Sequence, residues 1–148
     1  MTSILEGVVQ RGTAKKLKDL KLNIAGKTGT TNKNTDTWFI GFTSNMVIGV
    51  YVGMDNPSPL GKFETGSKTA LPIFKKFVTE AIKKSDARPF KVPDKIKMMV
   101  VDPLTGQKAK FSSKNTIIEA YKEKNIKDGK VLYSDNNRLD VNNILKFY

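Results

Sequence analysis

The sequence predicts an α+β fold in which helices cover a three-stranded antiparallel sheet and a small C-terminal extension follows. Three strand-like runs, separated by polar turns, lie between residues 22 and 54. Residues 67–84 then repeat apolar side chains at helical spacing, and two prolines precede a second hairpin signal. We therefore expect three parts, a first domain at residues 1–84, a linker at 85–95 and the extension at 96–148.

The N-terminal residues predict a short helix at about 3–11. Four apolar residues repeat there at helical spacing: Ile4, Leu5, Val8 and Val9. Ser3 and Glu6 fit a capping box at the start of this helix, and Gly12 is placed to end it. The lysine-rich residues 15–21 are expected to form a solvated loop.

The expected sheet is a meander of three strands. The first, at about residues 22–31, carries several polar side chains, and the second, at 37–43, should place Trp38 and Phe39 on opposite faces because side chains alternate. The third, at 46–54, is apolar on both faces, which is typical of a central buried strand. Short polar turns between the runs favour antiparallel pairing.

Residues 67–84 predict an amphipathic helix that covers this sheet. One apolar stripe runs along it: Ala70, Ile73, Phe74, Phe77, Val78, Ala81 and Ile82. In the extension, residues 96–101 and 108–111 flank an Asp-Pro-Leu-Thr-Gly turn and predict a hairpin. We expect a helix at 116–124 and a further one at 139–147.

The composition excludes several classes of enzyme and partner. The chain has no cysteine and no histidine, so thiolate chemistry and Ser-His-Asp or Cys-His machinery are excluded, and we predict no metal and no cofactor. The formal charge is +12, but lysines spread along the chain carry most of it, whereas the reading of bases favours arginine. Nucleic acid is therefore not favoured as a partner. No apolar run approaches the ~20 residues of a membrane span, and the first residues lack a signal-peptide pattern.

The run Ala25-Gly26-Lys27-Thr28-Gly29-Thr30-Thr31 is the candidate site. In an extended strand, Thr28 and Thr30 share one side, Lys27 takes the other, and Gly29 lets a ligand approach closely. Their hydroxyls would hold a carboxylate while a backbone N–H faces a developing oxyanion. A Walker A loop is excluded, because Lys21 stands where that motif needs glycine. A lone Lys-Thr-Gly also fits a hairpin edge without function.

The surrounding residues resemble class A penicillin-binding proteins, at the end of their transpeptidase domain. The resemblance is carried by the candidate run together with Gly7-Val8-Val9-Gln10-Arg11-Gly12-Thr13, Trp38-Phe39-Ile40-Gly41-Phe42 and Val50-Tyr51-Val52-Gly53. It covers about residues 1–84 strongly, through Gly66-Ser67 and the helix that follows, and continues weakly into Val101-Asp102-Pro103-Leu104-Thr105-Gly106. It implies a fragment of the penicillin-binding transpeptidase (β-lactamase-like) fold.

The resemblance also implies roles for the candidate site. Lys27 would contact the serine of a Ser-x-Asn motif, and Thr28 and Thr30 would hold the carboxylate of a D-alanyl-D-alanine stem peptide or of a β-lactam. The N–H of Thr30 would supply half of the oxyanion hole, and Gly29 would keep the strand open to substrate. These four residues are the predicted substrate-binding set.

Two of the three motifs of this mechanism are missing. No serine has lysine three positions later, so this chain contains no predicted catalytic residue. Ser-x-Asn strings begin at Ser113 and Ser134, but both follow the Lys-Thr-Gly, the reverse of the family order, and we interpret them as coincidences. The chain is expected to be inert alone.

Three hypotheses remain open from the sequence. The chain is a truncated piece of a cross-linking transpeptidase, or half of a split enzyme that a separate N-terminal half completes, or a basic module that binds anionic wall polymer or nucleic acid. Resemblance implies the periplasmic face of the cytoplasmic membrane, and a true start at Met1 would imply the cytoplasm. The family sheet has five strands, the last pairing with the first, so residues 46–54 should form an open, self-associating edge here.

Overall fold

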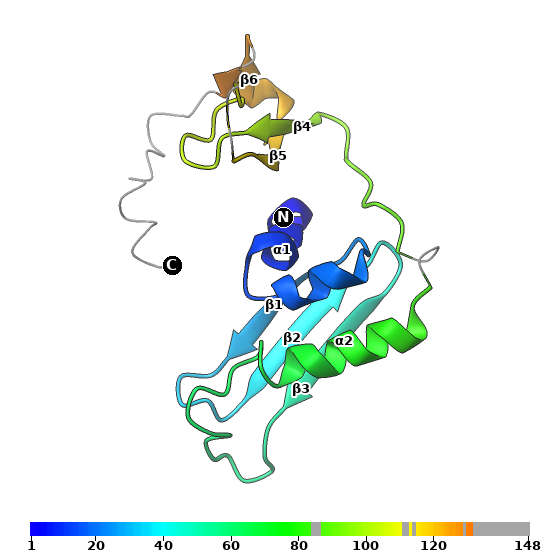
Figure 1. The fold of residues 1–148 in the computed structure, drawn as a ribbon, viewed down its shortest axis with the longest axis vertical. Helices are drawn as coiled ribbons and strands as arrows, with labels where there is room; N and C mark the ends of the chain where they lie inside the picture. Colours follow the sequence, from blue (N-terminus) through cyan, green and yellow to red (C-terminus); the bar gives the residue numbers. More distant parts are fainter. Residues whose placement is uncertain (84–86, 111–112, 114, 129, 132–148) are drawn as a thin grey trace. The chain divides into compact units, whose positions relative to one another are not determined.

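The computed structural model describes residues 1–83, 87–110, 113, 115–128 and 130–131 (Figure 1). It divides into two compact units, Met1–Lys91 and Val92–Tyr148, which we describe separately. The helix expected at 139–147 and the string that begins at Ser134 lie outside the described residues.

The first unit begins with helix α1 (Thr2–Arg11) and the 3-10 helix η1 (Lys15–Leu20). The predicted capping box is wrong: Met1 occupies the N-cap, where no side chain caps the helix, so Ser3 already lies inside the first turn. Gly12 ends α1 as predicted, and its N–H bonds to the carbonyl of Val8. The lysine-rich segment is a helix and not a loop, because the fully buried Leu17 anchors it to the core.

The predicted meander is confirmed as an antiparallel sheet of order β1 (Ala25–Thr30), β2 (Thr37–Phe42) and β3 (Val47–Val52). Phe39 is fully buried while Trp38 is exposed, as the alternation predicted. The pattern typical of a central buried strand is misleading for residues 46–54, whereas the expectation that they form an edge of the sheet is confirmed. β3 is an edge strand among the described residues, and its side chains alternate between exposed and half-buried.

Two hydrogen bonds at the strand ends fix the direction of every backbone group in the sheet. Thr31 N–H donates to the carbonyl of Asp36 at 3.0 Å, and Thr43 N–H donates to the carbonyl of Met46 at 2.9 Å. Because bonded and non-bonded pairs alternate along an antiparallel ladder, residues 26, 28 and 30 of β1 turn their backbone groups away from β2. Residues 47, 49 and 51 of β3 turn theirs away from β2 on the opposite side.

Helix α2 (Ala70–Ala81) packs over β2 and β3 and builds the core of this unit (Figure 1). Its Phe74 ring meets the Phe39 ring edge-on, with centroids 4.6 Å apart. The buried side chains of the helix and its C-cap are Ala70, Leu71, Phe74, Val78 and Ile82. Part of the predicted stripe is wrong: Ile73, Phe77 and Ala81 are exposed, because three strands cover only one flank of the helix.

The second unit contains the hairpin of β4 (Ile96–Val101) and β5 (Ile117–Lys122). The helix predicted at 116–124 is therefore wrong, because β-branched Ile117 and Ile118 favour a strand once β4 supplies a partner. The turn after β4 forms, with Gly106 N–H bonded to the Asp102 carbonyl, but among the described residues a single bridge, Val101 to Lys108, stands in place of the expected strand at 108–111.

Three short elements complete the second unit: η3 (Glu123–Asn125), β6 (Ile126–Lys127) and β7 (Lys130–Val131). Between the units, Ala87 is buried in the first core and the Phe90 ring lies 5.6 Å from that of Phe42. Part of the expected linker thus packs on the first unit, because it carries apolar side chains, and the domain boundaries at 84 and 95 stay a prediction.

Candidate functional site

The Lys-Thr-Gly-Thr run forms the exposed edge strand β1, and its side chains alternate as predicted. Thr28 and Thr30 stand opposite Phe39 and Thr37 in the register, on the sheet face that carries the core. Lys27 and Gly29 stand opposite Ile40 and Trp38, on the outer face. The backbone N–H and carbonyl of Thr28 and Thr30 point out of the sheet at the free edge, where a ligand can reach them.

Each threonine hydroxyl of the run has a partner from a distant segment. Thr28 Oγ1 lies 3.0 Å from Thr13 Oγ1, and either oxygen can donate. Thr30 Oγ1 accepts the Gly66 N–H at 3.1 Å. Because that bond uses a lone pair of Thr30, the hydroxyl proton is left for an acceptor such as a carboxylate.

Gly66 is a site-building residue that the sequence reasoning did not assign a role. A Cβ at this position would lie 2.8 Å from the carbonyl oxygen of Gly29 and against that of Trp38, so only glycine allows this approach. The segment is held by Thr69, whose hydroxyl donates to the carbonyl of Thr65 at 3.0 Å and lies 2.6 Å from that of Thr37. The only local signal was a glycine just before the helix.

The Lys27 side chain is exposed and curls to the free edge, where its Nζ donates to the carbonyl of Thr28 at 3.0 Å. This carbonyl faces outward beside the outward N–H of Thr30. An ammonium, a hydroxyl and a backbone N–H therefore converge along one strand edge. All three are donors, so the edge suits an anion or a polarised carbonyl oxygen.

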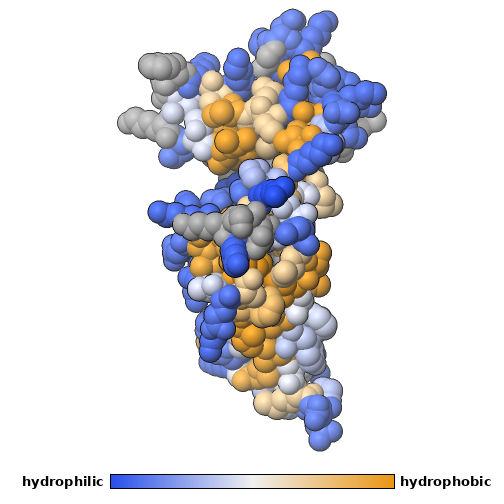
Figure 2. All heavy atoms as spheres, turned by 90° about the vertical axis from the view of Figure 1, so that its right-hand side faces the viewer, coloured by the Kyte–Doolittle hydropathy of each residue, from blue (hydrophilic) through white to orange (hydrophobic). Residues whose placement is uncertain are grey.

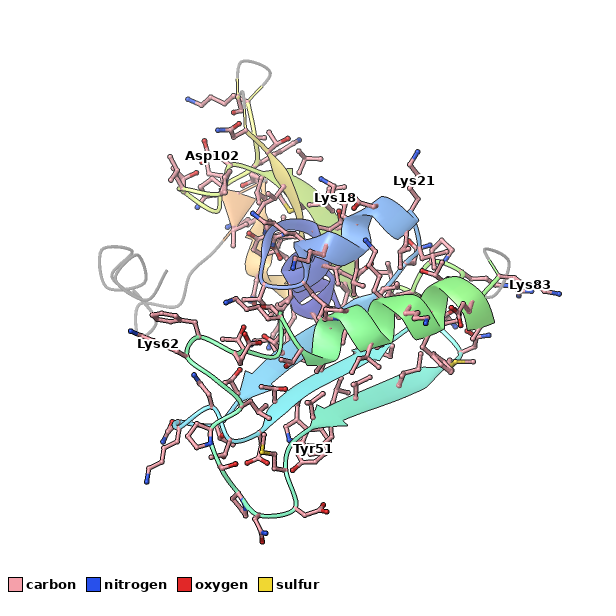
Figure 3. The ribbon with its side chains drawn as sticks, turned by 60° about the horizontal axis from the view of Figure 1, so that its bottom comes forward. Lys18, Lys21, Tyr51, Lys62, Lys83 and Asp102 are labelled. Atoms are coloured by element: carbon pink, nitrogen blue, oxygen red, sulfur yellow. The ribbon has the colours of Figure 1, made fainter. Side chains whose placement is uncertain are left out.

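A polar network fixes the turn that follows Thr30. Thr31 Oγ1 accepts the backbone N–H groups of Thr35 and Asp36 at 3.1 and 3.0 Å. The Asp36 carboxylate accepts the Tyr51 hydroxyl at 2.7 Å and the Thr35 hydroxyl at 2.8 Å. Tyr51 is labelled on β3 in Figure 3. These two bonds, that of Tyr51 first, lower the pKa of Asp36, and the same bond raises the pKa of Tyr51. The network joins the turn that follows β1 to β3, and no motif in the sequence predicted it.

The described residues supply no nucleophile for this edge. Ser67 is the serine closest in sequence to Gly66, and its Oγ lies 2.9 Å from the Thr65 hydroxyl, with no lysine three positions on. Ser113 lies in the second unit, away from the run in sequence and outside the predicted order of motifs. Within the part of the chain that the structure covers, no group of three acidic residues is placed to hold a metal ion, and no helix is long and apolar enough to cross a membrane.

Comparison with known proteins gives a consistent picture. Residues 1–79 match the family model of the penicillin binding protein transpeptidase domain. The chain is 46% identical over 144 residues to penicillin-binding protein 1A of Rickettsia bellii, covering 95% of this chain and 18% of that protein. It is 50% identical over 126 residues to penicillin-binding protein 1A of Rickettsia prowazekii, covering 85% of this chain and 16% of that protein.

A solved structure shares the fold. The crystal structure of penicillin-binding protein 1A from Haemophilus influenzae superposes with a TM-score of 0.62 at 28% identity, over 82% of this chain and 19% of that chain. The chain thus spans less than a fifth of the length of these relatives.

Proposed function

Since this chain belongs to the family of penicillin binding protein transpeptidase domains, we propose that β1 is one wall of a D-alanyl-D-alanine transpeptidase site used in peptidoglycan cross-linking. The observation that carries the proposal is the free edge of β1, where the Lys27 ammonium, the Thr30 hydroxyl and the outward N–H of Thr30 converge. The ligand is a stem peptide ending in a carboxylate, or a β-lactam that mimics it.

Each member of this edge has a distinct role in the proposal. Thr28 and Thr30 hold the substrate carboxylate, and the Gly66 N–H turns the Thr30 hydroxyl so that its proton points to that anion. The N–H of Thr30 stabilises the oxyanion that forms when the peptide carbonyl is attacked. Lys27 adds a positive charge that favours both anions. Gly29 has no side chain to block the approach of the peptide.

The acyl-transfer step needs a serine that this chain does not provide in the required motif. In the mechanism of the family that the sequence resembles, a neighbouring lysine activates that serine. One wall of the site alone binds the substrate without reacting with it. We therefore propose that the chain acts only with the preceding part of a transpeptidase domain, at the periplasmic face of the cytoplasmic membrane. An N-terminal half as the partner is supported by the edge of β3, which no strand of the described residues covers, because it exposes backbone groups to which further strands can bond.

Intact-mass measurement with a fluorescent penicillin tests this function. The chain alone should remain unmodified. Mixed with a polypeptide that comprises the preceding transpeptidase residues of the Rickettsia bellii relative, it should promote one acyl adduct on that polypeptide. Thr30→Val should slow acylation by about 10- to 100-fold, since it removes a donor to the carboxylate. Thr79→Val is the control, because its hydroxyl only bonds to Lys75 within α2.

Two outcomes would overturn the proposal. A stoichiometric adduct on a serine of the isolated chain would mean that the nucleophile lies here after all. An adduct on the partner polypeptide that forms equally fast without this chain, or with Thr30→Val as with the control, would mean that β1 is not the wall of the site.

A further inference from the structure

The loop between β3 and α2 carries an exposed aromatic residue in an unusual backbone conformation. Phe63 is 66% exposed and has a φ of 67°, in the left-handed region that bulky residues rarely adopt. The Lys62 ammonium lies over its ring, 5.4 Å from the centroid, and we call these two residues the loop pair. A strained residue that presents a large apolar side chain to water indicates a contact with a ligand.

Two hydrogen bonds hold this loop against the end of β1. The Leu60 N–H donates to the carbonyl of Asn34, in the turn after β1, at 2.9 Å, and the Gly66 N–H donates to the Thr30 hydroxyl at 3.1 Å. At about 3.8 Å between consecutive Cα atoms, each residue of the loop pair lies within about 12 Å of one of these anchors. Figure 3 shows the labelled lysine of the pair beside the tip of β1. The apolar residues that gather over α2 and β3 in Figure 2 lie toward the opposite edge of the sheet.

The proposed function, on which this inference rests, fixes the direction of the stem peptide along β1. The terminal carboxylate lies at the hydroxyls of Thr28 and Thr30, on the side of the Lys27 ammonium. The carbonyl that is attacked faces the N–H of Thr30 and belongs to the residue before the last. The preceding residues of the peptide therefore continue past Thr30, toward the turn at 31–36 to which the loop is bonded.

The surface beyond Thr30 carries positive charge from two segments. Lys33 is exposed in the turn after β1, and Lys62 is exposed on the loop that is bonded to this turn. In the part of the chain that the structure describes, neither ammonium is paired with a carboxylate. Of the nearby acids, Asp36 already accepts two hydroxyl groups and Glu64 is half-buried. An anionic group of a ligand would find two free cations here.

From this arrangement we propose that the loop pair and Lys33 select the residue that precedes the two D-alanines of the stem peptide. The preferred residue carries a side-chain carboxylate at the end of an apolar stem. The carboxylate pairs with the ammonium groups of Lys33 and Lys62, and the methylene groups of the stem pack against the Phe63 ring. These residues determine specificity and are not catalytic, because the carbonyl that is attacked lies at Thr30.

Competition between two matched peptides tests this specificity in the mixture of the chain with the partner polypeptide. The acetylated tripeptides Glu-D-Ala-D-Ala and Gln-D-Ala-D-Ala differ by one side-chain charge, and each competes with the fluorescent penicillin for the site. The glutamate peptide should compete about five- to tenfold better, because two exposed charge pairs each contribute a few-fold. The preference should become smaller at high salt, which screens exposed charges.

Substitutions of the lysines should remove the preference for the glutamate peptide. Lys62→Gln should reduce it to about two- to threefold, and Lys33→Gln combined with Lys62→Gln should abolish it. Lys18→Gln is the matched control, because Lys18 is exposed on η1, before the start of β1, and lies apart from Lys62 in Figure 3. Phe63→Asn should weaken both peptides to a similar extent, because asparagine tolerates the left-handed backbone but lacks the ring.

Amide chemical shifts of the isolated chain separate this proposal from the proposed function. Both peptides should shift the amide signal of Thr30, whereas the amides of the loop pair should respond more strongly to the glutamate peptide. A mixture that penicillin does not acylate, together with an unchanged Thr30 amide, would overturn the proposed function and this proposal with it. An acylated mixture in which the two peptides compete equally, or in which the double lysine variant keeps the preference, would overturn the selectivity alone.

Discussion

The two edges of the first sheet both expose outward backbone groups, but one edge carries polar side chains and the other carries apolar ones. Along β1, the free edge is lined by Lys27, Thr28 and Thr30. Along β3, it is lined by Val47, Gly49 and Tyr51, without a charge. A charged and hydroxylated edge retains water and selects anions, whereas an apolar edge gains free energy when another strand covers it. The side chains, and not the ladder itself, decide whether a strand edge receives a ligand or a partner.

The largest expected effect comes from the core that supports both edges. Phe74→Ala should destabilise the unit by about 3–5 kcal/mol, because it removes a fully buried ring and leaves a cavity against Phe39. Phe77→Ala on the same helix removes a ring that is 47% exposed and should cost much less. Urea denaturation followed by circular dichroism measures both, at a concentration where the chain is monomeric. Equal losses would show that the two flanks of α2 are not as different as described.

A pair of glycines contrasts the edges directly. Gly66→Ala should destabilise by about 1–3 kcal/mol, since its Cβ would press on two backbone carbonyls beside β1 that cannot move aside. Gly49→Ala at the β3 edge should be neutral or stabilising by about 0.5 kcal/mol, because its Cβ meets open space and alanine suits a strand better than glycine. Thermal unfolding compares the two variants, and a harmless Gly66→Ala would remove Gly66 from the wall of the site.

Amide hydrogen exchange sharpens the comparison residue by residue. When the polypeptide that comprises the preceding transpeptidase residues is added, the outward amides of Gly49 and Tyr51 should be protected at least about tenfold over those of Thr28 and Thr30, because only β3 gains a strand partner. In Val47→Lys this difference should disappear. Fast exchange at Gly49 in this mixture would show that both edges stay equally open.

The smallest effect concerns the Tyr51–Asp36 bond that joins the two edges. Since the pKa of Asp36 is lowered below its ordinary value of 3.8, its contribution to stability is present above pH 3.8 and is lost as pH falls through the lower folded pKa. Tyr51→Phe should raise the pKa of Asp36 toward that ordinary value and reduce this acid dependence. A carbon-13 NMR titration of the Asp36 carboxyl group measures it, with Thr79→Val as control. An unchanged titration would show that the Tyr51 bond does not hold the carboxylate in solution.

Local patterns predicted the elements of the first unit well, and contacts between distant residues explain the failures. The alternation around Trp38 and Phe39 is a property of one strand, so the sequence was sufficient for it. The bond from Gly66 to Thr30 joins residues 36 positions apart, and no motif near either residue predicts it. The helical periodicity placed Ile73 and Phe77 on the apolar stripe of the helix, but it does not indicate which segment covers them.

In the second unit, too, a distant contact decides the local structure. Residues 117–122 have β-branched side chains at one end, yet their strand depends on β4, about 20 residues earlier, which a local pattern does not include. The roles of Lys27, Thr28, Gly29 and Thr30 came from resemblance and stay predictions until acylation is measured. The structure adds that the backbone N–H and carbonyl of Thr30 point out of the sheet. That direction depends on the pairing with β2, so no short stretch of the sequence shows it.

The chain also carries its own optical reporter. Trp38 is its single tryptophan, stands opposite Gly29 on the outer face of the sheet, is 43% exposed and has its ring centroid 4.8 Å from that of Tyr51. The fluorescence of an indole in this place depends on contact with water at the outer face of the sheet, where Lys27 also stands. A peptide that settles there would shift its fluorescence emission to shorter wavelengths, and a strand added beside Tyr51 would change the energy transfer between the rings. Unlabelled protein in a cuvette can therefore report which edge has been occupied.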